Sequence, residues 1–154
     1  MFDLKNIIVP TDFSELSITA LEYAKEMAEK MEAKIHLVYV LEKTPPFLAM
    51  SSFNVSEEEV MKSMEEQAHK QLKKIVRNIT EDSSIRIIEI LRKGVDYEEI
   101  IKYSKEINSD MIVIATHGRT GILHNLLGSV AEKVIRYSQC PVLVISPEEK
   151  GGLT

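Results

Sequence analysis

The sequence contains one cysteine, no tryptophan and no long run of apolar residues. The single Cys140 excludes an intramolecular disulfide and fits a reducing compartment. No stretch approaches the ~18 continuous apolar residues that span a membrane. Residues 1–5 include Asp3 and lack the basic region and apolar core of a signal peptide. We therefore expect a cytoplasmic protein that does not interact with a membrane.

Positive charge is also scarce. The chain has 19 lysines and arginines against 24 aspartates and glutamates, which gives a net charge of −5 without any basic run. Because nucleic-acid phosphates are bound by clustered Lys and Arg, this balance argues against a nucleic-acid partner. The 154 residues, 44% of them apolar and 28% charged, are typical of one folded domain.

Apolar residues recur along the chain with two alternating periods. Short apolar runs predict strands at residues 6–9, 33–40, 84–91, 111–114 and 141–145. Apolar residues three or four positions apart predict four intervening helices, the last at residues 130–137. This alternation predicts a doubly wound, Rossmann-like α/β domain with a five-stranded parallel sheet over residues 1–147, followed by a polar tail at 148–154.

Two segments between these elements have their own signals. Ser56 with Glu59 has the form of a capping box, which predicts the start of the second helix. The preceding stretch, residues 41–55, contains two prolines but is too apolar for a solvated linker. It has two interpretations, a loop that packs its own side chains on the domain, or a lid or partner contact beside a ligand.

Residues 115–130 hold the most informative pattern. They follow a predicted buried strand and lead into a predicted helix, so this glycine-bearing loop presents backbone N–H groups and a helix N-terminus to an anion. Gly118 and Gly128 are separated by nine residues, and Ser129 follows directly. Phosphate is the natural candidate for the anion.

This spacing resembles the signature of the nucleotide-binding members of the universal stress protein family, which is Gly, two residues, Gly, nine residues, Gly, then Ser or Thr. Gly118, Gly128 and Ser129 match the signature, whereas Ala115 stands where it has glycine. Further similarity lies in Ile-Val-Pro-Thr-Asp-Phe-Ser near the start and Cys-Pro-Val-Leu-Val-Ile near the end. The resemblance implies the strand order 3-2-1-4-5, in which strands one and four flank the ligand crevice.

Ala115 leaves two possibilities open. If the position needs a positive φ, or lets phosphate approach the backbone closely, the added methyl group costs roughly 1 kcal/mol of binding. If φ is negative and the side chain points away, alanine is harmless.

The resemblance implies an ATP site in the crevice. Asp12 would accept hydrogen bonds from ribose hydroxyls, the backbone of Val40 would hold the adenine edge, and the glycine loop would hold the phosphates. Mg²⁺ or Mn²⁺ would be bound through the phosphates, because the sequence shows no compact carboxylate or histidine cluster. The implied site residues are Pro10, Thr11, Asp12, Val40, Ala115, His117, Gly118, Arg119, Gly128, Ser129 and Val130.

Several of these residues also have a purely structural interpretation. Asp12 precedes a helix and would serve equally as its N-cap. Ser129 with Glu132 has the form of a capping box, which is compatible with phosphate binding at the same helix start. His36 and His69 are expected to be ordinary surface or half-buried residues.

The resemblance therefore implies an ATP-binding regulatory module of the stress-response type, with no catalytic residues assigned. Efficient turnover is disfavoured, because the chain has no Gly-x-x-x-x-Gly-Lys-Ser/Thr loop. The alternatives are a slow ATPase and a dimeric partner protein that binds no nucleotide. A homodimer is expected because Val142 to Ile145 is an apolar run on the predicted sheet edge, and the resemblance implies antiparallel pairing of that strand with its twofold copy.

Overall fold

The computed structural model describes residues 3–42, 56–117 and 127–147. These ranges contain five strands, which are β1 (Asn6–Pro10), β2 (Lys34–Leu41), β3 (Ile87–Lys93), β4 (Met111–Ala115) and β5 (Val142–Ile145). All the pairings are parallel and the order is β3-β2-β1-β4-β5. The helices of the same ranges are α1 (Glu15–Met31), α3 (Glu57–Thr80), α4 (Asp96–Glu106) and α5 (Ser129–Tyr137). The predicted class and strand order are confirmed.

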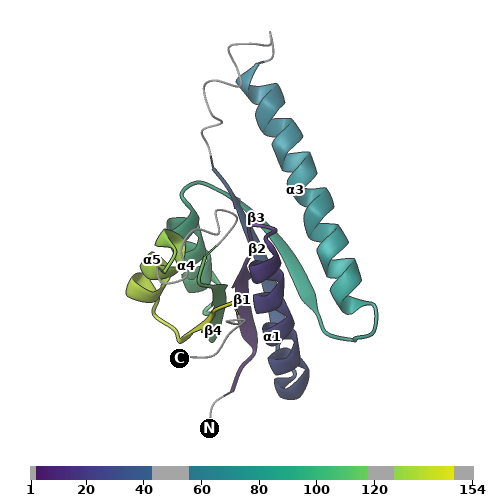
Figure 1. Ribbon diagram of the computed structural model, residues 1–154, viewed down its shortest axis with the longest axis vertical. Coiled ribbons are helices and arrows are strands. Elements are labelled where there is room, and N and C mark those ends of the chain that lie inside the picture. The colour runs from purple at the N-terminus through teal and green to yellow at the C-terminus, as the bar shows by residue number, and fades with distance from the viewer. Residues whose placement is uncertain (1–2, 43–55, 118–126, 148–154) are drawn as a thin grey trace, which may run out of the picture.

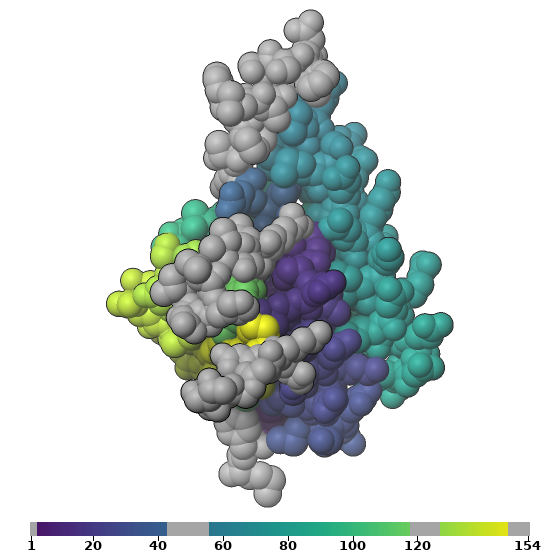
Figure 2. Space-filling model, viewed as in Figure 1, coloured from purple at the N-terminus to yellow at the C-terminus, as the bar shows by residue number. Residues whose placement is uncertain are grey.

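The sheet is buried by helices on both faces (Figure 1). Because successive strand residues point to opposite faces, Ile7 and Val9 of β1 join the core shared with α1 and α3. Ile8, between them, joins the second core under α4 and α5. Figure 2 shows α3 along one flank of the molecule and α5 on the opposite flank. No helix in the described ranges has the length and apolar character needed to cross a membrane.

The element boundaries follow the predicted ones closely, with two informative shifts. Pro10 was expected to stop the first strand, but it is the last residue of β1, and Thr11 N–H still donates to the Val38 carbonyl at 2.9 Å. The third strand was expected at residues 84–91 and lies at Ile87–Lys93. The predicted capping box of α3 is confirmed, since the Ser56 hydroxyl accepts from Glu59 N–H and the Glu59 carboxylate accepts from Ser56 N–H.

His36 was expected at the surface or half-buried, and this is wrong. It lies on β2 with only 6% of its surface exposed. Its Nδ1 is 2.8 Å from the Tyr103 hydroxyl and its Nε2 is 3.2 Å from Asn6 Oδ1. The alternating pattern of the strand predicts which face of the sheet His36 lies on. It does not predict that Tyr103 of α4 covers that face. Burial lowers the pKa of His36, and the positive charge of Lys34 adds to the effect.

This lowered pKa gives the stability a dependence on pH. Protonation of His36 costs more in the folded than in the unfolded chain, so its contribution is full above the unfolded pKa of about 6.5 and is lost as pH falls towards the folded pKa. His36→Gln removes this titration. We expect the stability difference between wild type and His36→Gln, measured by urea denaturation at pH 7.5 and pH 5, to shift in favour of the variant at the lower pH. A difference that is constant with pH would contradict this assignment.

Candidate functional site

A cavity of about 420 Å³ lies at the carboxyl edge of the sheet, where β1 and β4 are neighbours and the strand order reverses. This is where open parallel sheets bind ligands, and the volume suits a small molecule. Among the residues that line it are nine predicted from the sequence, which are Pro10, Thr11, Asp12, Val40, Ala115, His117, Gly128, Ser129 and Val130. The other two predicted residues, Gly118 and Arg119, lie outside the described residues.

The other lining residues were not among the predicted site residues, although Thr116 lies within the glycine-bearing stretch at 115–130. They come from the ends of β2 and β4, from α4, and from the first turns of α1 and α5, and they are Ser17, Val38, Tyr39, Glu42, Asp96, Ile100, Ile114, Thr116 and Ala131. Asp96 had the clearest available signal, because it is an acidic residue directly after a strand and a glycine turn.

Gly128 fixes the connection between β4 and α5 by close backbone approach. Thr116 N–H donates to the Ile145 carbonyl at 2.8 Å, and Gly128 N–H donates to the Thr116 carbonyl at 2.6 Å. A Cβ on Gly128 would lie 2.7 Å from that carbonyl oxygen and 3.2 Å from His117 Cα. The φ of Gly128 is −61°, which any residue adopts. The position therefore requires glycine for space and not for its backbone conformation.

The start of α5 differs from the predicted capping box. Gly128 is the N-cap and Ser129 is already the first helical residue, so no side chain caps the helix. Glu132 N–H donates to the Gly128 carbonyl at 2.9 Å as the first regular helical bond. The N–H groups of the first turn have no acceptor within the helix, and this turn, through Ser129, Val130 and Ala131, lines the cavity. The partial positive charge of a helix N-terminus therefore lies at the cavity wall.

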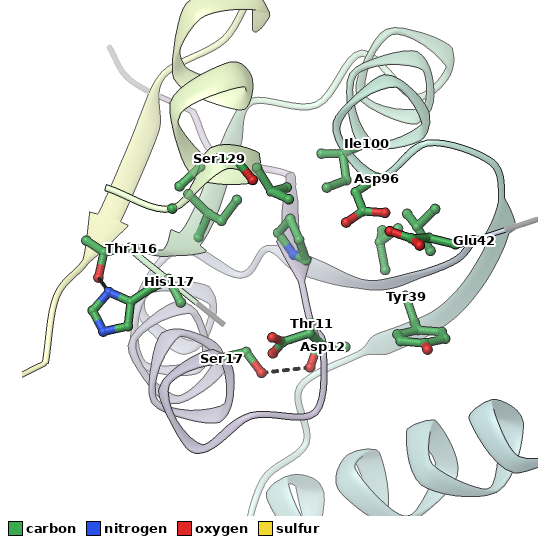
Figure 3. A pocket seen from close by; sticks show the side chains of 18 residues that line it. Thr11, Asp12, Ser17, Tyr39, Glu42, Asp96, Ile100, Thr116, His117 and Ser129 are labelled. Carbon is green, nitrogen blue, oxygen red and sulfur yellow. Dashed lines mark hydrogen bonds between the residues drawn. The ribbon is translucent and has the colours of Figure 1, made fainter. Parts of the chain in front are cut away.

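The loop between β1 and α1 forms the facing wall. The N-cap of α1 is Ser14, so the interpretation of Asp12 as the cap is wrong. The carboxylate of Asp12 instead accepts from Ser14 N–H at 3.0 Å, which forms a local turn. The hydroxyls of Thr11 and Ser17 lie 2.9 Å apart, and that of Thr11 also accepts from Phe13 N–H. These bonds hold Thr11 and Asp12 at the cavity (Figure 3).

Phe13 holds this loop against β2, although its backbone conformation is unfavourable. Its φ of 67° lies in the left-handed region, which costs a bulky residue on the order of 1–3 kcal/mol. Its ring stacks on that of Tyr39 with the centroids 4.4 Å apart. This contact offsets part of the cost and ties the loop to β2.

Ala115 carries no backbone penalty. The non-glycine residues with positive φ in the described ranges are Phe13, Glu32 and Asn108. Ala115 is the last residue of β4, is 9% exposed and packs in the core beside α1. The positive φ that would make alanine unfavourable is therefore absent at this position.

Carboxyl groups gather away from α5. Asp12, Glu42 and Asp96 all line the cavity, and burial raises the pKa of Asp96, with the neighbouring charge of Glu42 adding to the effect. In the part of the chain that the structure describes, no three His, Cys, Asp or Glu side chains are placed to hold a metal ion. The arrangement suits a ligand with an anionic group at one end and hydrogen-bond donors at the other.

Comparison with known proteins gives a consistent result. The model of the universal stress protein family matches residues 3–146. Universal stress protein MJ0531 of Methanocaldococcus jannaschii is 34% identical over 146 residues, which cover 95% of this chain and 84% of the relative. The solved structure of the MJ0577 protein, from the same organism, has a TM-score of 0.81 at 30% identity and covers 96% of this chain and 99% of that one.

Two further solved structures contain nucleotides. A universal stress protein in complex with cAMP has a TM-score of 0.70 at 20% identity, with coverage of 94% of this chain and 98% of that one. The universal stress protein from Archaeoglobus fulgidus in complex with dAMP has a TM-score of 0.65 at 21% identity, with coverage of 94% and 99%. At these identities the likeness to this chain shows the fold.

The close approach at Gly128 predicts a large effect of a single methyl group. Because its Cβ would lie 2.7 Å from the Thr116 carbonyl oxygen, Gly128→Ala should lower the free energy of unfolding by about 1–3 kcal/mol. Ser129→Ala, at the next and exposed position, is the matched control and should change it by less than about 0.5 kcal/mol. Urea denaturation measures both values. Equal stability of the two variants would show that α5 does not depend on this contact.

Proposed function

The chain belongs to the universal stress protein family, and from that premise we propose that it binds ATP in the cavity between β1 and β4 as a nucleotide-dependent regulatory module. The observation that carries the proposal is the start of α5, where a first helical turn without a side-chain cap lines the cavity. Such a turn binds phosphate well. The cAMP and dAMP held by two proteins of the same fold are both adenine nucleotides, which supports the choice of base.

The proposed roles follow the position of each residue around the cavity. Gly128, Ser129 and Val130 would hold the phosphates through backbone N–H groups and the serine hydroxyl. Asp12 would accept hydrogen bonds from the ribose, and the backbone of Val40, at the end of β2, would hold the adenine edge. On sequence alone the proposal extends to Gly118 and Arg119. Mg²⁺ or Mn²⁺ would enter with the phosphates and neutralise part of their charge.

The proposal assigns binding and regulation, not turnover. Among the described residues that line the cavity there is no lysine or arginine to lie over the terminal phosphates. The alternative of a dimeric partner that binds no nucleotide depended on Ala115. The φ of this residue is not positive, so alanine causes no backbone strain there. The observations therefore favour a nucleotide-dependent protein over that alternative.

The proposal is tested first by chromatography of any small molecule released from the purified protein, and then by calorimetric titration with Mg-ATP. Ser129→Asp places a carboxylate where we propose phosphate, while an acidic residue in the first turn favours the helix. We expect it to lower ATP affinity roughly tenfold or more without lowering the melting temperature, and to leave adenosine binding unchanged.

Ser63→Asp is the control, since it adds the same charge at an exposed position on α3. It should bind ATP as the wild type does. Failure of the wild type to carry or take up any adenine nucleotide would contradict the proposed function. An unchanged ATP affinity in Ser129→Asp would contradict the phosphate position.

We also propose a homodimer through β5. This strand is an edge of the five-stranded sheet and an exposed apolar edge favours pairing. Ile112 N–H donates to the Pro141 carbonyl and Thr116 N–H to the Ile145 carbonyl. The carbonyls of Pro141 and Ile145 therefore face β4. Because the backbone N–H and C=O groups of successive strand residues point to opposite edges, the N–H of Val144 points to the outer edge of the sheet.

Val144→Pro removes that outward donor and should convert the dimer to monomer at micromolar concentration, as measured by light scattering. Val144→Thr keeps the donor and the side-chain shape, and should remain dimeric. A monomeric wild type would contradict the homodimer, and a dimeric proline variant would contradict the interface.

A further inference from the structure

One backbone contact brings the end of β2 against the turn before α4. Gly94 N–H donates to the Leu41 carbonyl at 3.0 Å. The φ of Gly94 is +153°, and a Cβ there would lie 2.9 Å from Cγ of Glu99, so this turn requires glycine. Glu42 follows Leu41 directly, and Asp96 comes two residues after Gly94 as the first residue of α4. The contact therefore places these two carboxyl groups at one end of the cavity.

The two side chains point into the cavity from different elements. Figure 3 shows Glu42 and Asp96 close to each other and near Ile100, on the side away from His117. Asp96 is half-buried, and its burial, together with the charge of Glu42, raises its pKa. An ionised carboxylate that is poorly solvated gains most from a ligand N–H donor. A ligand that supplies such a donor is therefore favoured at this end.

The two ends of the cavity differ in charge, with carboxyl groups at this end and the partial positive charge of the helix N-terminus at the start of α5. In a nucleotide the phosphates and the base project from opposite sides of the ribose. If the phosphates lie at Ser129 and the ribose lies near Asp12, the base extends towards Glu42 and Asp96. Carboxylates only accept hydrogen bonds, and the exocyclic amino group of adenine donates two.

We infer that Glu42 and Asp96 determine base specificity by accepting hydrogen bonds from the 6-amino group of the purine. This inference rests on the proposed function and deepens it, because it names the atoms by which the cavity would select adenine. The hydrophobic side chain of Ile100 lines the same end and would contact one face of the base.

The test compares ATP with purine riboside 5′-triphosphate, which is ATP without its 6-amino group. Calorimetric titration of the wild type, with Mg²⁺ present, should show roughly tenfold tighter binding of ATP. Glu42→Ala and Asp96→Ala should each reduce this preference, and the double variant should abolish it. Removing negative charge will strengthen the binding of both anionic ligands, so the ratio of their affinities is the relevant quantity.

Two variants serve as controls. Glu98→Ala removes a carboxylate from the same first turn of α4, but at an exposed position outside the cavity lining. It should keep the full preference for ATP. Asp96→Asn retains one acceptor oxygen and should keep part of it. Thermal melting of each variant confirms that the ratio is measured on folded protein.

The outcomes separate this inference from the proposed function. If the wild type binds both triphosphates equally, or the double variant keeps its preference, the inference is overturned while ATP binding stands. If the variants instead change the preference for ATP over 2′-deoxy-ATP, the carboxylates contact the ribose and the inference is equally overturned. If the wild type binds neither triphosphate, the proposed function fails and the inference fails with it.

Discussion

The close approach of Gly128 to the backbone of Thr116 determines where α5 begins, and the cavity depends on that position. The N–H of Gly128 donates to the carbonyl of Thr116, the first residue after β4, so the helix starts next to the end of the strand. The same contact leaves no side chain at the N-cap. As a result the first-turn N–H groups contribute to the cavity wall at the point where β1 and β4 are neighbours.

Polarity across the cavity follows from three turns of the chain. The turn into α5 contributes the positive end of a helix, and the turn into α1 holds Asp12 through hydrogen bonds to its neighbours. The turn into α4, at Gly94, sets Asp96 beside Glu42. A ligand with separated anionic and donor groups matches this arrangement better than an anion alone.

The sequence predicted the fold class from apolar periodicity, while the strand order came from the family resemblance. Residues in contiguous motifs, such as Pro10 to Asp12 and Gly128 to Val130, were predicted at the cavity. Glu42 and Asp96 were missed because the pairing of β2 with β3 and the hydrogen bond from Gly94 to Leu41 bring them together, and neither is visible in the sequence. The helix caps were wrong for Asp12 and Ser129 because a cap depends on where the helix starts to within one residue. The burial of His36 depends on Tyr103 of α4, which periodicity along one strand does not show.

The most direct test of the account is a titration of ¹⁵N-labelled protein with Mg-ATP, followed in two-dimensional ¹H–¹⁵N spectra. The account predicts that the largest chemical-shift changes fall on the amides of Val130 and Ala131 at the start of α5 and on those of Thr11 and Asp12. Shifts confined to the surfaces of α1 and α3, or no shifts at millimolar ATP, would contradict it.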